Sequence, residues 1–328
     1  MKRGKSIAIT ATVAIAAVGG AIGLKTVLNA IIGKNKPRIL DDNSAMKELN
    51  DSFAPYREQM RRGTENLRAI KSNRVSIVSF DGLALVGHWF QAKNAKRTLV
   101  MMHGFRSSWD NDFSNALDFY INKMHCNLLI AEQRAHGASQ GKYIGYGILE
   151  RYDCVEWARY ADLRCKKSLP IYLDGMSMGA TTVLLASELD LPANVRGIIA
   201  DSGYTSPADI LSHILKKSYN LPEKPILPLL SSLCKAVAGY GFYDRSTVQA
   251  LKNNTRPVLL VHGMDDNFVP YEMSEINYEA CTAPCDLVLV NEAGHGLSYL
   301  VNREKCENAL VKLFNKCECN DFKGENQT

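Results

Sequence analysis

The stretch that decides the fold is PIYLDGMSMGATTVLLA, residues 170–186. It begins with a short apolar run typical of a buried strand and ends with a helix-like run, and GMSMG at 175–179 lies between them. A sharp turn from strand to helix brings two backbones close together, so glycine, which has no Cβ, is needed on both sides of the serine. The hydroxyl then stands at a helix N-terminus, where developing negative charge is stabilised. The setting predicts that Ser177 is a nucleophile rather than a helix N-cap.

Short apolar runs of the same kind recur along the chain, and helix-like stretches separate them. Such runs are typical of strands buried on both faces, and the alternation indicates an α/β fold with a mostly parallel central sheet and helices on both faces. Two further runs flank Asp81-Gly82, which predicts an antiparallel hairpin at one edge. The expected buried strands are 97–104, 126–132, 170–175, 195–201, 256–263 and 285–292, and the helix-like stretches are 110–124, 147–163, 178–189, 270–280 and 297–314.

One segment interrupts this alternation. Residues 203–245 are too long for a simple crossover and carry several prolines, so we expect two short helices that form a small cap over the sheet's carboxyl edge. The main domain is expected to span 71–318. Residues 35–70 are interpreted as a linker and surface helix, and 319–328 as a tail that holds Cys319.

The N-terminus has the pattern of a membrane segment. After MKRGK, no charged residue occurs from Ser6 to Leu24, and this run is close to the ~20 residues that a helix needs to cross a bilayer. We therefore expect residues 1–34 to be a retained single-pass anchor in the cell membrane, with the main domain outside the cytoplasm. The alternative is a signal peptide that is cleaved to release a secreted protein. The nine cysteines fit an oxidising compartment poorly.

Composition excludes several classes of protein. The net charge of +5 is mild for 328 residues, and Lys and Arg are scattered, so no nucleic-acid site is expected. No histidine or cysteine pair has metal-ligand spacing, and we predict neither a metal nor another cofactor. An odd number of irregularly spaced cysteines is not a disulfide framework, and Cys317 with Cys319 is interpreted as part of an exposed tail.

A serine nucleophile needs a base, and the base needs an acid that orients it. Asp265 and Asp266 follow one expected strand, and His295 lies in a glycine-flanked turn after the last one. Because parallel strands end at one edge of the sheet, these groups are expected near Ser177. We predict His295 as the general base and Asp266 as its orienting acid, with Asp265 as a direct rival and Asp201 as a more distant one.

An oxyanion formed at this serine needs two backbone N–H donors. One is expected from Met178, which follows the nucleophile, and the other from Phe105, in the loop after residues 97–104. Trp109 either lines the same pocket or packs on the surface. The remaining strand-end histidines are interpreted as structural, namely His103, His136 and His262.

Five segments in this order resemble the α/β-hydrolase superfamily over roughly residues 70–316: HGF, EQRAHGASQGKYIGYG, GMSMG, HGMDDNFVP and AGHG. The resemblance is strongest to a bacterial branch grouped with serine aminopeptidases, monoglyceride lipases and eukaryotic ABHD-type acyl-protein thioesterases. It implies the α/β-hydrolase fold, and members often carry an N-terminal membrane segment. In the family's H-G-x-x-D-x-x-V-P segment the aspartate is the triad acid, which favours Asp266 over Asp265. The family's R-x-x-G-x-S-x-G loop maps onto Arg134, Gly137, Ser139 and Gly141.

The expected chemistry is two-step acyl transfer on a carboxylic ester, including thioesters and lipid-like esters, through an acyl-enzyme. A peptidase with the same triad is one alternative, and it would be favoured by an acidic cap residue that captures a substrate amine. The cap offers only Glu223 and Asp244. The other alternative is a membrane-tethered binding protein without turnover.

Overall fold

The fold is built on one eight-stranded sheet in the computed structural model, which describes residues 21–34 and 44–318. The strands lie in the order β1-β2-β4-β3-β5-β6-β7-β8. β2 pairs antiparallel with β1 and β4, and all other pairs are parallel. This confirms the mostly parallel sheet predicted from the sequence. The bounds are β1 (Asn73–Val78), β2 (Ala84–Phe90), β3 (Arg97–Met102), β4 (Cys126–Glu132), β5 (Ile171–Met176), β6 (Val195–Asp201), β7 (Val258–Gly263) and β8 (Cys285–Val290).

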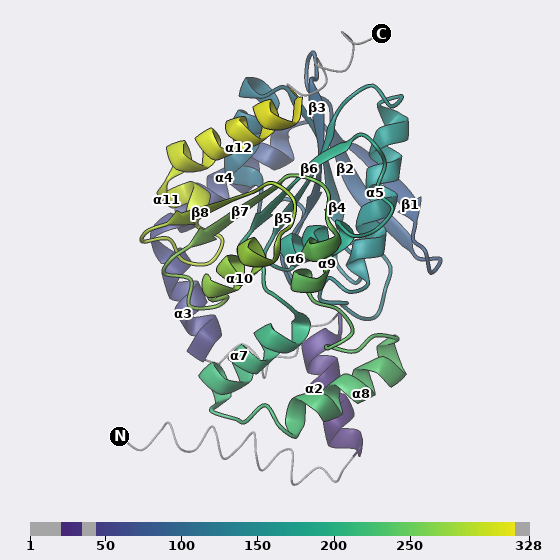
Figure 1. Ribbon diagram of the computed structural model, residues 1–328, viewed down its shortest axis with the longest axis vertical. Helices are drawn as coiled ribbons and strands as arrows, with labels where there is room; N and C mark the ends of the chain where they lie inside the picture. The colour runs from purple at the N-terminus through teal and green to yellow at the C-terminus, as the bar shows by residue number, and fades with distance from the viewer. Residues whose placement is uncertain (1–20, 35–43, 319–328) are drawn as a thin grey trace.

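Helices cover both faces of the sheet (Figure 1). Alternate residues of one strand enter different cores, as Val100 and Leu99 of β3 do, and this explains the continuous apolar runs. One face carries α5 (Glu150–Arg164), α6 (Met178–Ala186), α9 (Thr247–Asn253) and α10 (Glu272–Ala280), and the other carries α4 (Arg57–Ala69), α11 (Ser298–Val301) and α12 (Arg303–Glu318) with the short turns η3 (Ser114–Ala116) and η4 (Phe119–Lys123).

A helical cap lies beyond the carboxyl ends of the parallel strands, at the lower end of Figure 1. The segment expected to form it contains α7 (Pro207–Tyr219) and α8 (Ile226–Ala238). A third helix, α2 (Ala21–Ile32), packs against α8, and its Leu28 and Ile32 are completely buried in the cap's core.

The N-terminal region differs from the expected division into an anchor over 1–34 and a linker over 35–70. Residues 21–34 pack on the cap and the main domain, whereas residues 1–20, which hold most of the uncharged run, lie outside the described residues. Among the helices within 21–34 and 44–318, none is long and apolar enough to span a bilayer. Residues 44–69 form α3 (Ser44–Phe53), the turn η2 (Ala54–Tyr56) and α4, which lie against the body of the protein.

Two local expectations were wrong. The stretch 110–124 forms separate short turns instead of one regular helix, because the side chains of Asn111 and Asp112 bond back to the preceding loop. Cys317 is buried at the end of α12 and is not part of an exposed tail. All eight cysteines within the described ranges have free thiols.

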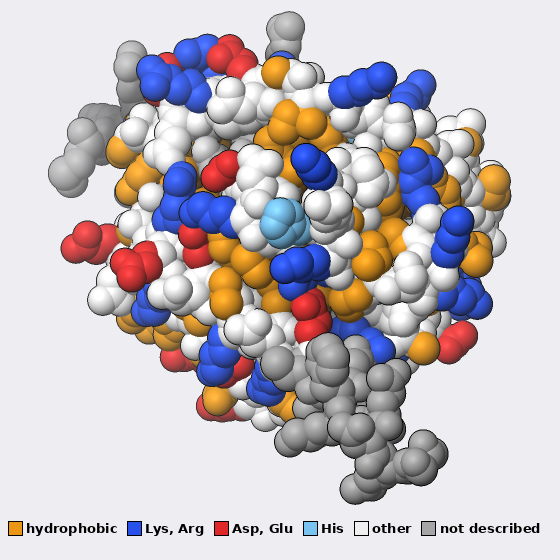
Figure 2. Space-filling model, turned by 90° about the horizontal axis from the view of Figure 1, so that it is seen from above, with side chains coloured by type: hydrophobic (Ala, Val, Ile, Leu, Met, Phe, Trp, Pro, Cys, Tyr) orange, Lys and Arg blue, Asp and Glu red, His pale blue; other side chains and the backbone are white. Residues whose placement is uncertain are grey.

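The face opposite the cap is seen in Figure 2. Lys and Arg are dispersed over it among apolar and uncharged groups. Over the described residues of this face, the basic side chains form no continuous tract of the kind that follows a nucleic-acid backbone.

Candidate active site

The turn between β5 and α6 holds Ser177 in a strained backbone conformation. Its φ is 56° and its ψ is −115°, values that L-residues rarely adopt. A Cβ at Gly179 would stand 1.7 Å from the carbonyl oxygen of Met102, and one at Gly175 would stand 2.2 Å from the carbonyl oxygen of Gly179. Neither position therefore admits a side chain, and the two glycines permit the close approach that projects Ser177 from the sheet edge.

Three predicted side chains meet at this edge. With the proton on Nδ1, His295 donates to Oδ2 of Asp266 at 2.7 Å, and the Ser177 hydroxyl donates to Nε2 of His295 at 2.9 Å. All three residues are buried. This is the relative geometry of a nucleophile, a base and the acid that orients the base.

The carboxylate of Asp266 is held on both oxygens. Oδ1 accepts the backbone N–H groups of Phe268 and Val269, at 2.9 and 2.8 Å, and Oδ2 also lies 3.1 Å from Nε2 of His262. Asp265 is exposed, and the hydrogen bonds of the His295 ring go to Asp266 and Ser177 instead. The geometry therefore favours Asp266, as the resemblance implied.

Asp201, the other rival, is also close to the nucleophile but has another arrangement. Its backbone carbonyl accepts the N–H of Ser177 at 2.8 Å, and its carboxylate accepts the hydroxyl of Ser202 at 2.9 Å. Its side chain makes no hydrogen bond to His295, so it contributes negative charge near the base without orienting it.

The opposite charges of His295 and Asp266 shift each other's pKa. Burial lowers the pKa of His295, but the negative charge of Asp266 and their hydrogen bond outweigh it, so the pKa lies above its ordinary value of 6.5. Burial raises the pKa of Asp266, but the charge of His295 and the hydrogen bond from His262 outweigh it and hold that pKa well below its usual range. Asp266 therefore remains ionised and stabilises a protonated His295.

The two predicted oxyanion donors lie beside the nucleophile. Met178 is the first residue of α6, and Phe105 lies in the loop after β3. Neither N–H donates a hydrogen bond to another residue of the described ranges. Two unengaged donors beside a serine hydroxyl are what a developing oxyanion requires.

Asp112 fixes the loop that carries Phe105, and the sequence gives no signal for this role. Its Oδ2 accepts the N–H of Gly104 at 2.6 Å, and its Oδ1 accepts the hydroxyl of Ser107 at 2.5 Å. The carboxylate thus ties both ends of the turn together. Burial raises the pKa of Asp112, against the opposing effect of these hydrogen bonds.

Arg106 joins the same loop to α2. Its Nη2 donates to the carbonyl oxygens of Ala30 and Gly33, at 2.8 and 3.2 Å, and its backbone N–H donates to Nε2 of His136 at 3.0 Å. These carbonyls lie at the end of α2, where a cation also interacts favourably with the helix dipole. The position of Phe105 is therefore coupled to the N-terminal helix.

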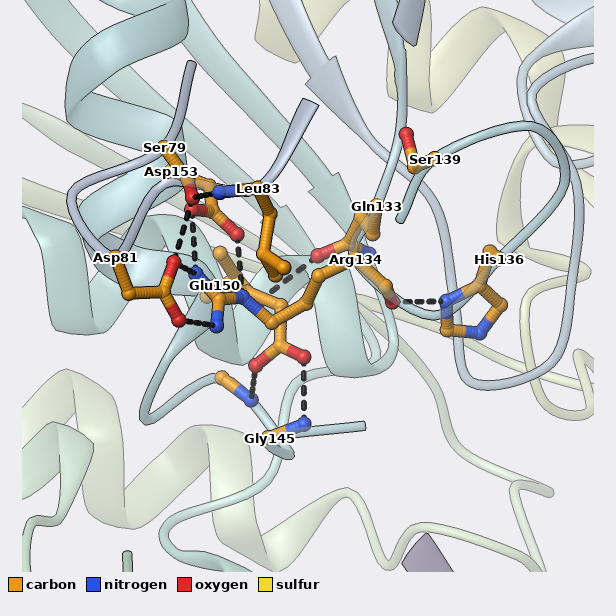
Figure 3. Close-up of polar contacts among 12 residues, drawn as sticks. Ser79, Asp81, Leu83, Gln133, Arg134, His136, Ser139, Gly145, Glu150 and Asp153 are labelled. Atoms are coloured by element: carbon orange, nitrogen blue, oxygen red, sulfur yellow. Dashed lines mark hydrogen bonds and ion pairs between the residues drawn. The ribbon is translucent and has the colours of Figure 1, made fainter. Parts of the chain in front are cut away.

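A network of ion pairs and hydrogen bonds, buried except at Asp81, supports the next loop, residues 132–147 (Figure 3). Arg134 forms a bidentate pair with Asp153 at 2.6 and 2.7 Å and reaches Asp81 at 2.9 Å. Below it, Glu150 accepts the backbone N–H groups of Gly145 and Gly147. The loop in turn places Tyr146 against the ring of Phe105, with 5.0 Å between centroids.

A cavity of about 460 Å³ opens at Ser177, and we call it the main cavity. Ser177, His295 and Phe105 lie on its wall. Its surface is largely apolar, and side chains of the cap helices and of α3 and α4 contribute to it. Three carboxyl groups also line it, those of Asp112, Asp174 and Asp201. The site thus combines one polar corner with a chamber suited to an apolar group.

The remaining predicted residues have structural contacts. Trp109 stacks on His88, with 3.8 Å between centroids, and does not line the main cavity. Burial lowers the pKa of His103 to about 4 and that of His136 to about 3, so both are neutral hydrogen-bonding groups. The described residues hold no cluster of three or more His, Cys, Asp or Glu side chains arranged for a metal ion.

The chain is similar to several known proteins. Residues 231–317 match the model of a family described as TAP-like protein. YqkD of Bacillus subtilis is 26% identical over 239 residues, which cover 73% of this chain and 78% of that protein. Human alpha/beta hydrolase domain-containing protein 17B is 25% identical over 209 residues, or 62% of this chain and 61% of that protein.

A solved structure has the same architecture. The esterase Pf2001 of Pyrococcus furiosus superimposes with a TM-score of 0.61 at 22% identity, over 77% of this chain and 95% of that one. At this identity the likeness establishes the fold. The sheet order, the strained serine turn and these relatives together place the chain in the α/β-hydrolase superfamily.

Proposed function

We propose that this α/β hydrolase cleaves carboxylic esters with an apolar acyl group, by means of a Ser177–His295–Asp266 triad and an acyl-enzyme intermediate. The observation that carries the proposal is the continuous hydrogen-bonded chain from Ser177 through His295 to Asp266, at 2.9 and 2.7 Å, on the wall of an apolar cavity.

In the first step the Ser177 oxygen attacks the ester carbonyl carbon while its proton passes to Nε2 of His295. The carbonyl oxygen becomes an oxyanion, which accepts hydrogen bonds from the N–H groups of Phe105 and Met178. When the tetrahedral species collapses, the C–O bond to the alcohol breaks and His295 gives its proton to the leaving oxygen. The acyl group remains on Ser177.

In the second step His295 removes a proton from water, and the resulting hydroxide attacks the acyl carbon. Collapse of the second oxyanion breaks the bond to Ser177, which takes the proton back from His295, and the carboxylic acid leaves. Asp266 stays ionised throughout and stabilises the imidazolium in both steps.

The cap supports an ester over a peptide with a free amino group. Glu223 accepts the hydroxyls of Ser212 and Tyr243, Asp244 pairs with Lys235 at 3.0 Å, and neither carboxylate lines the main cavity. The carboxyl groups that do line the main cavity lie outside the cap and already accept hydrogen bonds: Asp112 from Gly104, Asp174 from Tyr120 and Asp201 from Ser202. No cavity-facing carboxylate of the described cap is therefore placed to capture a substrate amine.

The experiment compares p-nitrophenyl esters with aminoacyl p-nitroanilides on one purified sample. We expect turnover of the esters, and a loss of about 10⁶ in kcat for Ser177→Ala. Faster turnover of the anilides would favour the peptidase. Absence of turnover with both, in a folded protein, would favour a binding protein without catalysis.

A further inference from the structure

A second cavity adjoins the main cavity on the N-terminal side. It is lined by residues of α3 and α4, including Asn50, Arg57 and Arg68, and by Asn111, and it is more open to solvent. We call it the side cavity. Three residues, Phe53, Met60 and Asn111, line both cavities. Their side chains are therefore the partition between the two spaces.

The partition rests on a helix that is fixed at both ends of the site. Glu48 of α3 pairs with Lys217 of α7 at 3.1 Å, and Lys217 also donates to the carbonyl oxygen of Asn267 at 2.7 Å. Ser52 lies so close to Gly294 that a Cβ there would stand 3.3 Å from the Ser52 Cβ. Helix α3 thus connects to α7 of the cap and, through Lys217, to the loop that follows Asp266, and it packs against the loop that holds His295.

The side of this helix that faces the main cavity is apolar. Leu49 and Phe53 lie one turn apart on α3, and Met60 follows on α4; all three are half-buried and line the main cavity. They share it with apolar side chains of α7, including Leu211, Ile214 and Leu215. None of these groups offers a hydrogen bond, so the chamber fits a hydrocarbon chain better than a polar alcohol.

We propose that Phe53, supported by Met60, is the end wall that limits the length of the acyl chain. This inference rests on the proposed function. A chain attached to Ser177 extends through the main cavity until it meets the Phe53 ring. Removal of the ring joins the main cavity to the side cavity, and each additional methylene that becomes buried raises the relative kcat/KM about fourfold.

The test measures kcat/KM for p-nitrophenyl esters from butyrate to palmitate, with the alcohol held constant. We expect Phe53→Ala to move the optimum to longer chains, Phe53→Leu to move it less, and Phe53→Trp to move it to shorter chains. Tyr56→Ala is the matched control, because Tyr56 is a half-buried aromatic residue of the same segment that lines neither cavity. An unchanged optimum in Phe53→Ala, or an equal shift in Tyr56→Ala, would overturn the proposal.

Binding separates this inference from the proposed chemistry. In a Ser177→Ala background, calorimetric titration with the corresponding fatty acids shows which chain length fits the main cavity best, and it does so without turnover. A shift toward longer acids in Phe53→Ala supports the wall even if the wild type hydrolyses no ester, in which case the proposed function fails alone. If the wild type hydrolyses esters but Phe53→Ala changes neither the rate optimum nor the binding optimum, the proposal for Phe53 is wrong and the proposed function stands. If no fatty acid binds in either background, the proposal that Phe53 limits acyl-chain length is wrong.

Discussion

Ser177 owes its position to two neighbours that have no side chain. The serine backbone lies at a φ of 56°, and Gly175 and Gly179 let β5, α6 and the end of β3 approach one another. The pentapeptide reveals this requirement because the backbone geometry is local. The partners of Ser177 were predictable for a related reason, since Asp266 and His295 follow strands that end at the same edge as β5.

Substitution Gly179→Ala should therefore disrupt the turn. The new Cβ would stand 1.7 Å from a backbone oxygen, and relief of this overlap should cost roughly 3 kcal/mol in the free energy of unfolding. Thermal unfolding should show a Tm lower by about 6–12 °C, with activity lost. Gly82→Ala is the control, since its φ is also positive but its Cβ would meet nothing within 4 Å. Equal effects of the two substitutions would contradict the packing argument.

The charge of Asp266 on His295 predicts a specific pH profile. His295 accepts a proton only when neutral, and its pKa is raised above 6.5, so kcat/KM should rise with pH through that raised value and then level off. Asp266→Asn removes the charge that raises the pKa. Its acidic limb should move to lower pH while kcat falls by about 10⁴. If the acidic limb of the kcat/KM profile lies at the same pH in Asp266→Asn as in the wild type, a group other than His295 controls the profile.

At the scale of the elements, the loop of Phe105, which we propose to hold an oxyanion donor, depends on contacts between distant segments. Asp112, Arg106 and the carbonyls at the end of α2 fix the loop of Phe105. Sequence patterns did not reveal these contacts, because each joins residues whose local propensities carry no information about the partner. The same limit applies to α3, whose half-buried positions at Leu49 and Phe53 predict an apolar face but not the surface it covers.

Arg106→Ala should release the loop from α2 and lower kcat with little change in KM, because an oxyanion donor acts in the transition state. We expect a loss of about tenfold, since the N–H of Phe105 remains present but less well positioned. Steady-state kinetics on one ester gives both parameters. Arg62→Ala, which alters an exposed arginine of α4 that pairs with Glu58, serves as the control. A pure rise in KM would indicate that Arg106 acts on substrate binding instead.

At the scale of the whole molecule, the sequence predicted the sheet, its helical layers and the cap, since these follow from the alternation of apolar runs. The boundary of the N-terminal segment was not predictable in this way. A helix with Leu28 and Ile32 on one face has the same composition whether it enters a bilayer or a protein core, and here it enters the core of the cap.

Membrane attachment stays a prediction that depends on the first residues of the chain. We expect the full chain to sediment with membranes and a variant without residues 1–20 to remain in the supernatant with unchanged kcat, because α2 is intact in it. Deletion of residues 1–34 should also remove the α2 carbonyls that Arg106 binds, and activity should fall. If the full chain and the variant without residues 1–20 distribute equally between membranes and supernatant, the prediction of a membrane anchor is wrong.

The most direct test of the account is covalent labelling of Ser177. A fluorophosphonate reacts with an activated serine hydroxyl, so it should label the wild-type chain, and digestion followed by mass spectrometry should place the adduct on Ser177. Ser177→Ala should not be labelled, and His295→Ala should be labelled much more slowly because the base that activates the hydroxyl is missing. Equal labelling of the wild type and Ser177→Ala, or an adduct on another residue, would contradict the assignment of the nucleophile.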